Sequence, residues 1–108
     1  MARYLFEMGI APHAFSTMLQ NPQDRLQATR PVFEAVGGKL EEYYFAVGQH
    51  IVYTLGEVPD LISLEALTMA VLAGGAVTSI KCIAILTATE VMEAMKKAQT
   101  LGYRPPTS

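Results

Sequence analysis

Hydrophobic residues follow two kinds of pattern along this chain. Short runs rich in aromatic, aliphatic or β-branched residues predict β-strands. They cover residues 3–9, 39–47, 50–57 and 77–86. Elsewhere, apolar residues recur at helical spacing, which predicts helices over residues 11–20, 21–36, 61–73 and 87–101.

The predicted helix ends carry their own signals. Asn21 is a favoured N-cap and Pro22 fits the first helical position, so we expect the second helix to begin there. The Gly37-Gly38 pair ends that helix. Pro31 lies inside it and removes one backbone hydrogen bond, so we expect a kink or a local break. Thr87-Ala88-Thr89-Glu90 fits a capping box at the start of the last helix.

The order of these elements is β-α-β-β-α-β followed by a C-terminal helix. This order is typical of the ferredoxin-like fold, an α+β class in which two helices cover one face of a four-stranded antiparallel sheet. We expect one domain over residues 1–102 and a flexible tail over residues 103–108.

The second face of the predicted sheet also needs a cover. In the third strand Ile51, Tyr53 and Leu55 alternate with His50, Val52 and Thr54, so neither face is plainly polar. Two largely apolar faces with one helical layer leave a surface exposed. We therefore expect the chain to pack sheet to sheet against a second copy, as a homodimer or a higher homo-oligomer.

Composition and charge exclude several classes of partner. Half of the 108 residues are apolar, 17% are charged, and the net charge is -2 without any basic cluster. A nucleic-acid partner is therefore not expected. The most apolar run is too short to span a bilayer and no signal peptide is recognisable, so no membrane partner is expected. A single cysteine, Cys82, fits a reducing cytoplasm.

Several short motifs together resemble the GYD-domain family. They are Gly37-Gly38-Lys39-Leu40 before a strand, VGQHIVYTLGEVPD at residues 47–60 before an Ala/Leu-rich helix, Asn21-Pro22 and Arg25-Leu26. The resemblance covers residues 3–95. The family comprises small bacterial proteins named for a Gly-x-Tyr-Asp turn, and the resemblance implies a dimeric α/β barrel with no established activity. Here Gly48 is kept, but His50 and Ile51 replace the Tyr and Asp.

The two histidines are the first candidates for chemistry. His50 sits at a strand end, where an imidazole can serve as a general base or a ligand contact. It can equally be a polar ring that follows an exposed turn. His13 stands near the start of the first helix, which in dimeric α/β barrels borders the cleft between sheet and helices. The alternative is a solvated side chain on the first helical turn.

Three strand residues are further candidates. Glu7 lies in the middle of the first strand, where burial would raise its pKa and make it a base, unless it faces solvent or pairs with a lysine. Tyr44 and Tyr53 belong to a group of aromatic residues on neighbouring strands. Such a group can line a pocket for a small apolar or aromatic ligand, or it can form core and interface.

No cofactor or metal is indicated by the sequence. The histidines are far apart, and no cluster of His, Cys or carboxylates has ligand spacing. Glu41 and Glu42 are neighbours in a predicted strand, so we expect them on opposite faces. Cys82 is expected to be an inert buried thiol.

Three functions remain open at this point. The first is a small-ligand-binding or regulatory/assembly module that acts as a homo-oligomer, with a pocket between sheet and helices. The second is a cofactor-independent enzyme of the monooxygenase or isomerase kind, with His50 or His13 as base and Tyr44 or Tyr53 positioning an aromatic substrate. The third is a purely structural subunit without a pocket.

Overall fold

A computed structural model describes residues 1–107, so Ser108 of the predicted tail lies outside the described residues. Its elements are β1 (Ala2–Ile10), α1 (Pro12–Gln20), α2 (Arg25–Ala35), β2 (Lys39–Phe45), β3 (Ile51–Val58), α3 (Leu61–Ala73), β4 (Val77–Ile85) and α4 (Ala88–Gln99). This order confirms the predicted α+β class. No helix within residues 1–107 has the length and the apolar run that a bilayer crossing requires.

The four strands form one antiparallel sheet in the order β2-β3-β1-β4. The first strand in the chain is therefore central, and the last strand lies beside it at an edge. Phe6 of β1 lies opposite Thr54 of β3 on one side and Cys82 of β4 on the other. This is the ferredoxin-like arrangement that the element order predicts.

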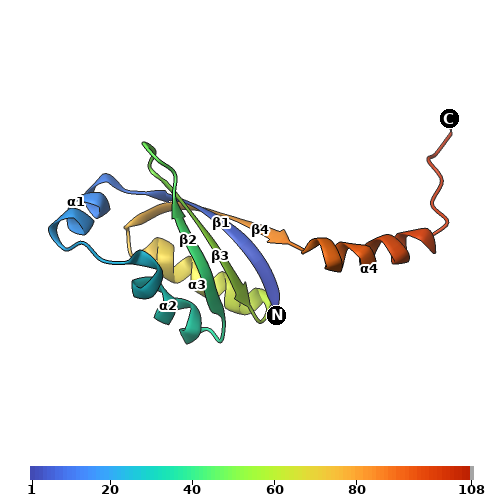
Figure 1. The fold of residues 1–108 in the computed structure, drawn as a ribbon, viewed down its shortest axis with the longest axis horizontal. Helices are drawn as coiled ribbons and strands as arrows, with labels where there is room; N and C mark the ends of the chain where they lie inside the picture. Colours follow the sequence, from blue (N-terminus) through green and yellow to red (C-terminus); the bar gives the residue numbers. More distant parts are fainter. Residues whose placement is uncertain (108) are drawn as a thin grey trace.

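One face of the sheet carries the hydrophobic core. Helix α2 packs over β2, and α3 packs over β4 and β3, on the same side of the sheet (Figure 1). Every second residue of β1 and β3 is buried against these helices. The core cluster includes Phe6, Phe33, Leu40, Val52, Val58 and Leu67. We call the opposite side the open face, since no helix of the described chain covers it.

The hairpin between β2 and β3 is longer than predicted. Strand β2 ends at Phe45 and not at residue 47, and β3 begins at Ile51. The turn closes where the Ala46 N–H donates to the Ile51 carbonyl and the Gln49 N–H donates to the Ala46 carbonyl. Gly48 has a φ of 76°, a left-handed conformation that favours glycine.

The predicted start of α2 is wrong. Asn21 and Pro22 lie in an irregular segment, and the helix begins at Arg25 with Asp24 as its N-cap. The Asp24 carboxylate accepts hydrogen bonds from the Leu26 and Gln27 N–H groups, which satisfies donors that Asn21 is too far upstream to reach. The helix runs without a break through Pro31 to Ala35, so the expected local break is absent.

A β-bulge in β2 overturns a second prediction. The pairing with β3 shifts between Leu40 and Glu42, so Glu41 is the extra residue on its strand. Glu41 contacts Arg3, and Glu42 stands opposite Leu55, a residue of the open face. Both carboxylates therefore lie on the open face, whereas strict alternation would separate them.

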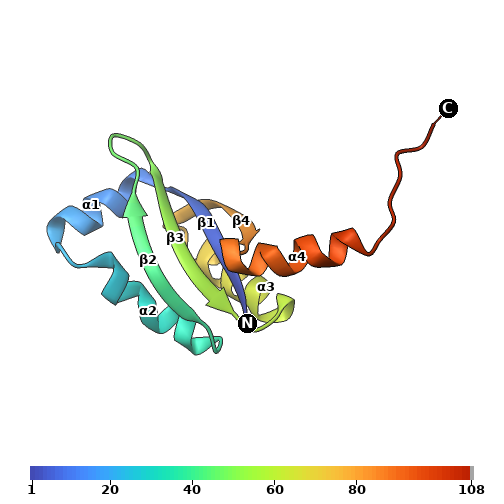
Figure 2. The ribbon, with the colours of Figure 1, turned by 45° about the vertical axis from the view of Figure 1, so that its right-hand side comes forward.

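Helix α4 begins as predicted and then leaves the body of the molecule. The Glu90 N–H donates to Thr87 Oγ1, and the Thr87 N–H donates to Glu90 Oε1, which completes the capping box. None of the residues of α4 is buried. Figures 1 and 2 show the helix projecting away from the sheet in both views. Its apolar stripe is only partly covered within residues 1–107, since Val91 is half-buried but Met95 is exposed.

The prediction of a buried Cys82 is also wrong. Cys82 is exposed because β4 is an edge strand. Partial burial of the thiol raises the pKa of Cys82, and the charge of Glu65 on α3 adds to this effect. A raised pKa disfavours the thiolate, which is the reactive form of cysteine.

Candidate ligand-binding site

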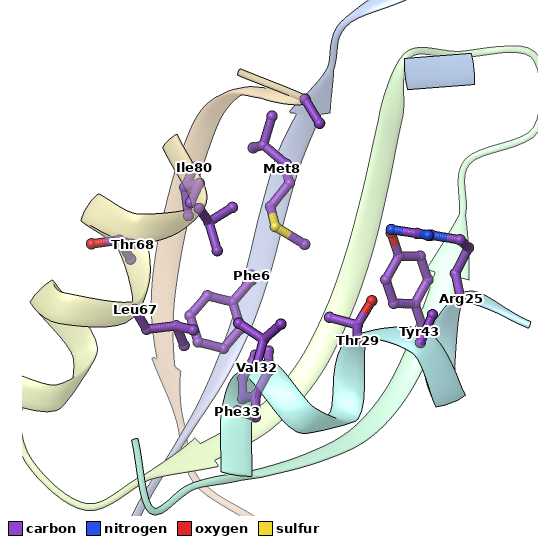
Figure 3. Close-up of a pocket in the computed structure, with 14 residues that line it drawn as sticks. Phe6, Met8, Arg25, Thr29, Val32, Phe33, Tyr43, Leu67, Thr68 and Ile80 are labelled. Atoms are coloured by element: carbon purple, nitrogen blue, oxygen red, sulfur yellow. The ribbon is translucent and has the colours of Figure 1, made fainter. Parts of the chain in front are cut away.

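A cavity of about 210 Å³ lies between the sheet and the two helices that cover it. Phe6 and Met8 of the central strand β1 contribute to one wall (Figure 3). Val32 and Phe33 of α2 and Leu67 of α3 contribute to the others. The lining is therefore mainly aliphatic and aromatic, which is typical of sites for small organic molecules.

The positions of the two helices explain why this space exists. Helix α2 packs over β2 at one edge of the sheet, whereas α3 packs mainly over β4 at the other edge. Side chains from the two helices extend toward each other over the central strand β1. Ala28 and Thr29 of α2 and Thr68 of α3 line the cavity with short side chains, so the gap is only partly filled.

One end of the cavity is polar. Arg25, Thr29 and Tyr43 line the cavity on the side of α2 and β2 (Figure 3). Arg25 is half-buried, and its Nε is fully shielded from solvent without a hydrogen-bond partner among residues 1–107. A buried N–H group of this kind normally has a partner, because an unpaired one costs free energy.

A second polar atom lies under the same wall. Thr54 is fully buried in β3, and its Oγ1 has no hydrogen-bond partner among the described residues. In the sheet, Thr54 lies between Phe6 of β1 and Tyr43 of β2, which both line the cavity. The helix-covered face is therefore not wholly apolar at the Tyr43 end.

The two candidate histidines lie at the surface. His50 is exposed at the end of the hairpin, and its ring packs edge-on against Phe15 of α1 with 5.9 Å between ring centroids. Its carbonyl accepts a hydrogen bond from the Ile10 N–H at 2.7 Å. His13 is exposed on the first turn of α1. Neither residue lines the cavity.

The other three candidates meet on the open face. The Tyr53 hydroxyl donates to Glu7 Oε1 at 3.1 Å, and the two residues are direct neighbours across β1 and β3. This hydrogen bond, with the charge of Glu7, raises the pKa of Tyr53. Tyr44 lies opposite Tyr53 and is 56% exposed, and Glu42 raises the pKa of Tyr44. Both phenols are thus held in their protonated form.

The open face also carries a cluster of ions around Arg3. Its guanidinium group contacts Glu41 at 3.1 Å, Glu57 at 3.4 Å and Glu90 at 3.9 Å. These carboxylates raise the pKa of Arg3, the largest cause being the hydrogen bond to Glu41. The cluster joins three strands to the first turn of α4. Within residues 1–107, no group of three or more His, Cys, Asp or Glu side chains is arranged to hold a metal ion.

The residues at the polar end of the cavity were missed by sequence reasoning, although one signal was present. Arg25 is the first residue of α2, a position where the helix dipole favours acidic side chains and disfavours basic ones. An arginine in that position needs another reason to be there. Tyr43 offered no such signal, since an aromatic residue in a strand is ordinary.

Comparison with known protein families identifies a relationship. A protein-family model described as GYD domain matches residues 4–95, which is most of the chain. A search of the curated proteins finds no match.

Proposed function

This chain belongs to the GYD-domain family, and we propose that it is a small-ligand-binding module that works as a homodimer. The observation that carries the proposal is the cavity between the sheet and helices α2 and α3. It combines a mostly apolar lining with a few polar groups gathered at one end, which is the usual composition of a site for a small organic molecule.

The size of the cavity sets the size of the ligand. Its volume of about 210 Å³ can be compared with an engineered apolar cavity of about 150 Å³ in another protein, which binds benzene. By that comparison the ligand has roughly eight to ten non-hydrogen atoms. A single ring with one substituent, or a short branched chain, is of this size.

Two uncovered apolar surfaces support the homodimer. On the open face, Leu5, Leu55 and Ile83 lie on three adjacent strands. The apolar stripe of α4 is the second surface. A second copy of the chain packed on the open face would remove much of this area from water.

We propose binding in preference to catalysis by a histidine. General base catalysis needs the imidazole within hydrogen-bond reach of the substrate. His13 and His50 are exposed and do not line the cavity. In a purely structural subunit, the third possibility, the cavity would bind no ligand. The following experiment separates a binding module from a structural subunit.

The test uses toluene, a neutral single-ring probe, and a variant that fills the cavity. Thr29→Phe on α2 places a ring at a half-buried residue that lines the cavity, so toluene binding observed by NMR titration should be lost. Ala35→Phe is the matched control, because Ala35 is exposed on the same helix and does not line the cavity. The control should bind toluene like the unaltered protein. Absence of binding of toluene, and also of a single-ring probe that carries a polar substituent, would refute the proposal.

A further inference from the structure

We infer that the ligand of this cavity carries a carboxylate or a similar small anionic group, which pairs with Arg25 while an apolar ring or branched chain occupies the remaining space. This inference rests on the proposed function and specifies its ligand class. It begins from the one charged side chain that lines the cavity, Arg25.

The charge of Arg25 has no carboxylate partner in the described chain. Among residues 1–107 no acidic side chain forms an ion pair with it, whereas Arg3 contacts three carboxylates. Asp24 is its neighbour in sequence, but the Asp24 carboxylate accepts from the N–H groups of Leu26 and Gln27 at the helix start. The guanidinium charge at the cavity is therefore available to an anion.

The donors at this end suit a carboxylate. A guanidinium group presents its N–H groups in a fixed fork that matches the two oxygens of a carboxylate. The Nε of Arg25 is shielded from solvent and has no partner among residues 1–107. Tyr43 lines the same cavity as Arg25, and its hydroxyl group offers a second donor to a ligand oxygen.

The rest of the lining excludes other ligand classes. A cation would face Arg25 without a carboxylate among the lining residues to offset the repulsion. A sugar or other polyol would place hydroxyl groups against Met8, Leu67 and Ile80, which offer no hydrogen bonds. A neutral hydrocarbon fits the apolar part but leaves the charge of Arg25 unpaired. Monocyclic aromatic acids and short branched carboxylic acids pair a carboxylate with Arg25 and place their apolar part against the apolar lining.

The experiment compares benzoate with toluene, which lacks the carboxylate, by calorimetric or NMR titration at neutral pH. In the unaltered protein, benzoate should bind about tenfold or more tightly than toluene, as expected for a charge-assisted pair. Arg25→Gln should remove this preference while toluene binding stays within about twofold. Retained toluene binding also demonstrates that the variant is folded.

Arg30→Gln is the matched control. It makes the same change of charge on the same helix, but Arg30 does not line the cavity, and its guanidinium group donates to Gln27 at 3.1 Å. Its preference for benzoate should equal that of the unaltered protein. Arg25→Lys keeps the charge without the fork and should retain only part of the preference.

The outcomes separate this inference from the proposed function. Toluene binding with no preference for benzoate, or a preference that survives Arg25→Gln, overturns the anionic ligand and leaves the binding module in place. Failure of both probes to bind overturns both proposals. An equal loss of preference in Arg30→Gln would show a general effect of charge, and would also overturn the pairing with Arg25.

Discussion

Gly56 of β3 lies against Phe33 of α2. A Cβ atom added to Gly56 would lie 2.7 Å from Phe33 Cε2 and 2.9 Å from the Lys39 carbonyl oxygen. Neither neighbour can move freely, because Phe33 is buried in the core and Lys39 belongs to β2. The absence of a side chain at this residue leaves room for the Phe33 ring of α2 against the sheet.

At the residue scale we therefore predict that Gly56→Ala lowers the free energy of unfolding by about 1–3 kcal/mol, the usual cost of overpacking. Urea denaturation followed by circular dichroism measures this change. Gly74→Ala provides the control, because Gly74 has a helical φ of -69° and its added Cβ would meet nothing closer than 3.4 Å. The control should change the stability little. Equal stabilities of the two variants would contradict this account of Gly56.

At the scale of the element, helix ends can be predicted from sequence where the residues that determine them lie close together in the chain. The capping box at Thr87 was predictable because both partners lie within four residues. Helix α3 has the predicted bounds, since Asp60 and the Gly74-Gly75 pair mark its ends. The bulge at Glu41 was not predictable, because a register shift depends on the partner strand and nothing in the β2 sequence specifies it.

The first turn of α4 should be sensitive to acid. The hydrogen bonds to the N–H group and side chain of Thr87 lower the pKa of Glu90 from its ordinary 4.5, and Arg3 adds to the effect. A lowered pKa in the folded state means that the ionised carboxylate stabilises the helix start above the ordinary pKa. This stabilisation is lost as the pH falls through the folded-state pKa.

We predict that amide protection in α4 decreases between about pH 6 and about pH 3, measured by NMR hydrogen exchange over residues 88–99. Glu90→Gln keeps a capping side chain without the titrating charge, so its α4 protection should be lower at pH 6 and change less with acid. Protection in α3 also depends on a titrating cap, Asp60, whose pKa is lowered by the Ser63 N–H. The variant should leave the acid response of α3 unchanged.

At the scale of the whole molecule, the chain is more extended than its length suggests. Its radius of gyration is 17.6 Å, whereas a globular chain of this length has about 13 Å. The difference comes from α4 and the following residues, which lie along the longest axis, of 59 Å. A second copy would offer α4 the apolar contacts that its own chain does not.

The proposed homodimer leads to a prediction at the scale of the whole molecule. Tyr53→Asp places a charge on the open face beside Glu7, so it should weaken the dimer about tenfold or more. Sedimentation velocity at micromolar concentration measures the change. Val47→Asp, at a hairpin residue that is 96% exposed, adds the same charge away from the sheet and should sediment as the unaltered protein. A Tyr53→Asp variant that remains fully dimeric would show that the interface lies elsewhere.

The cavity is also a feature of the whole molecule. The sequence could therefore suggest its general position, but not the residues that line it. A pocket between sheet and helices was one of three possibilities left open, and it rested on analogy with dimeric α/β barrels. That Arg25 from α2 and Tyr43 from β2 line one cavity depends on how far the helix stands from the sheet. That distance is set by contacts between distant parts of the chain, such as Gly56 with Phe33. The candidates from sequence, by contrast, lie on the open face or at exposed ends.

The outward direction of α4 also has a practical consequence for handling the protein. The helix carries residues 100–107 to one extreme of the long axis, on the far side of the molecule from α1 and α2 (Figure 1). A tether attached at Tyr103 or Arg104 would keep the sheet and its two covering helices away from a sensor surface. The cavity and the hairpin would then face the flowing solution, so immobilisation by this end suits binding measurements better than immobilisation through lysines.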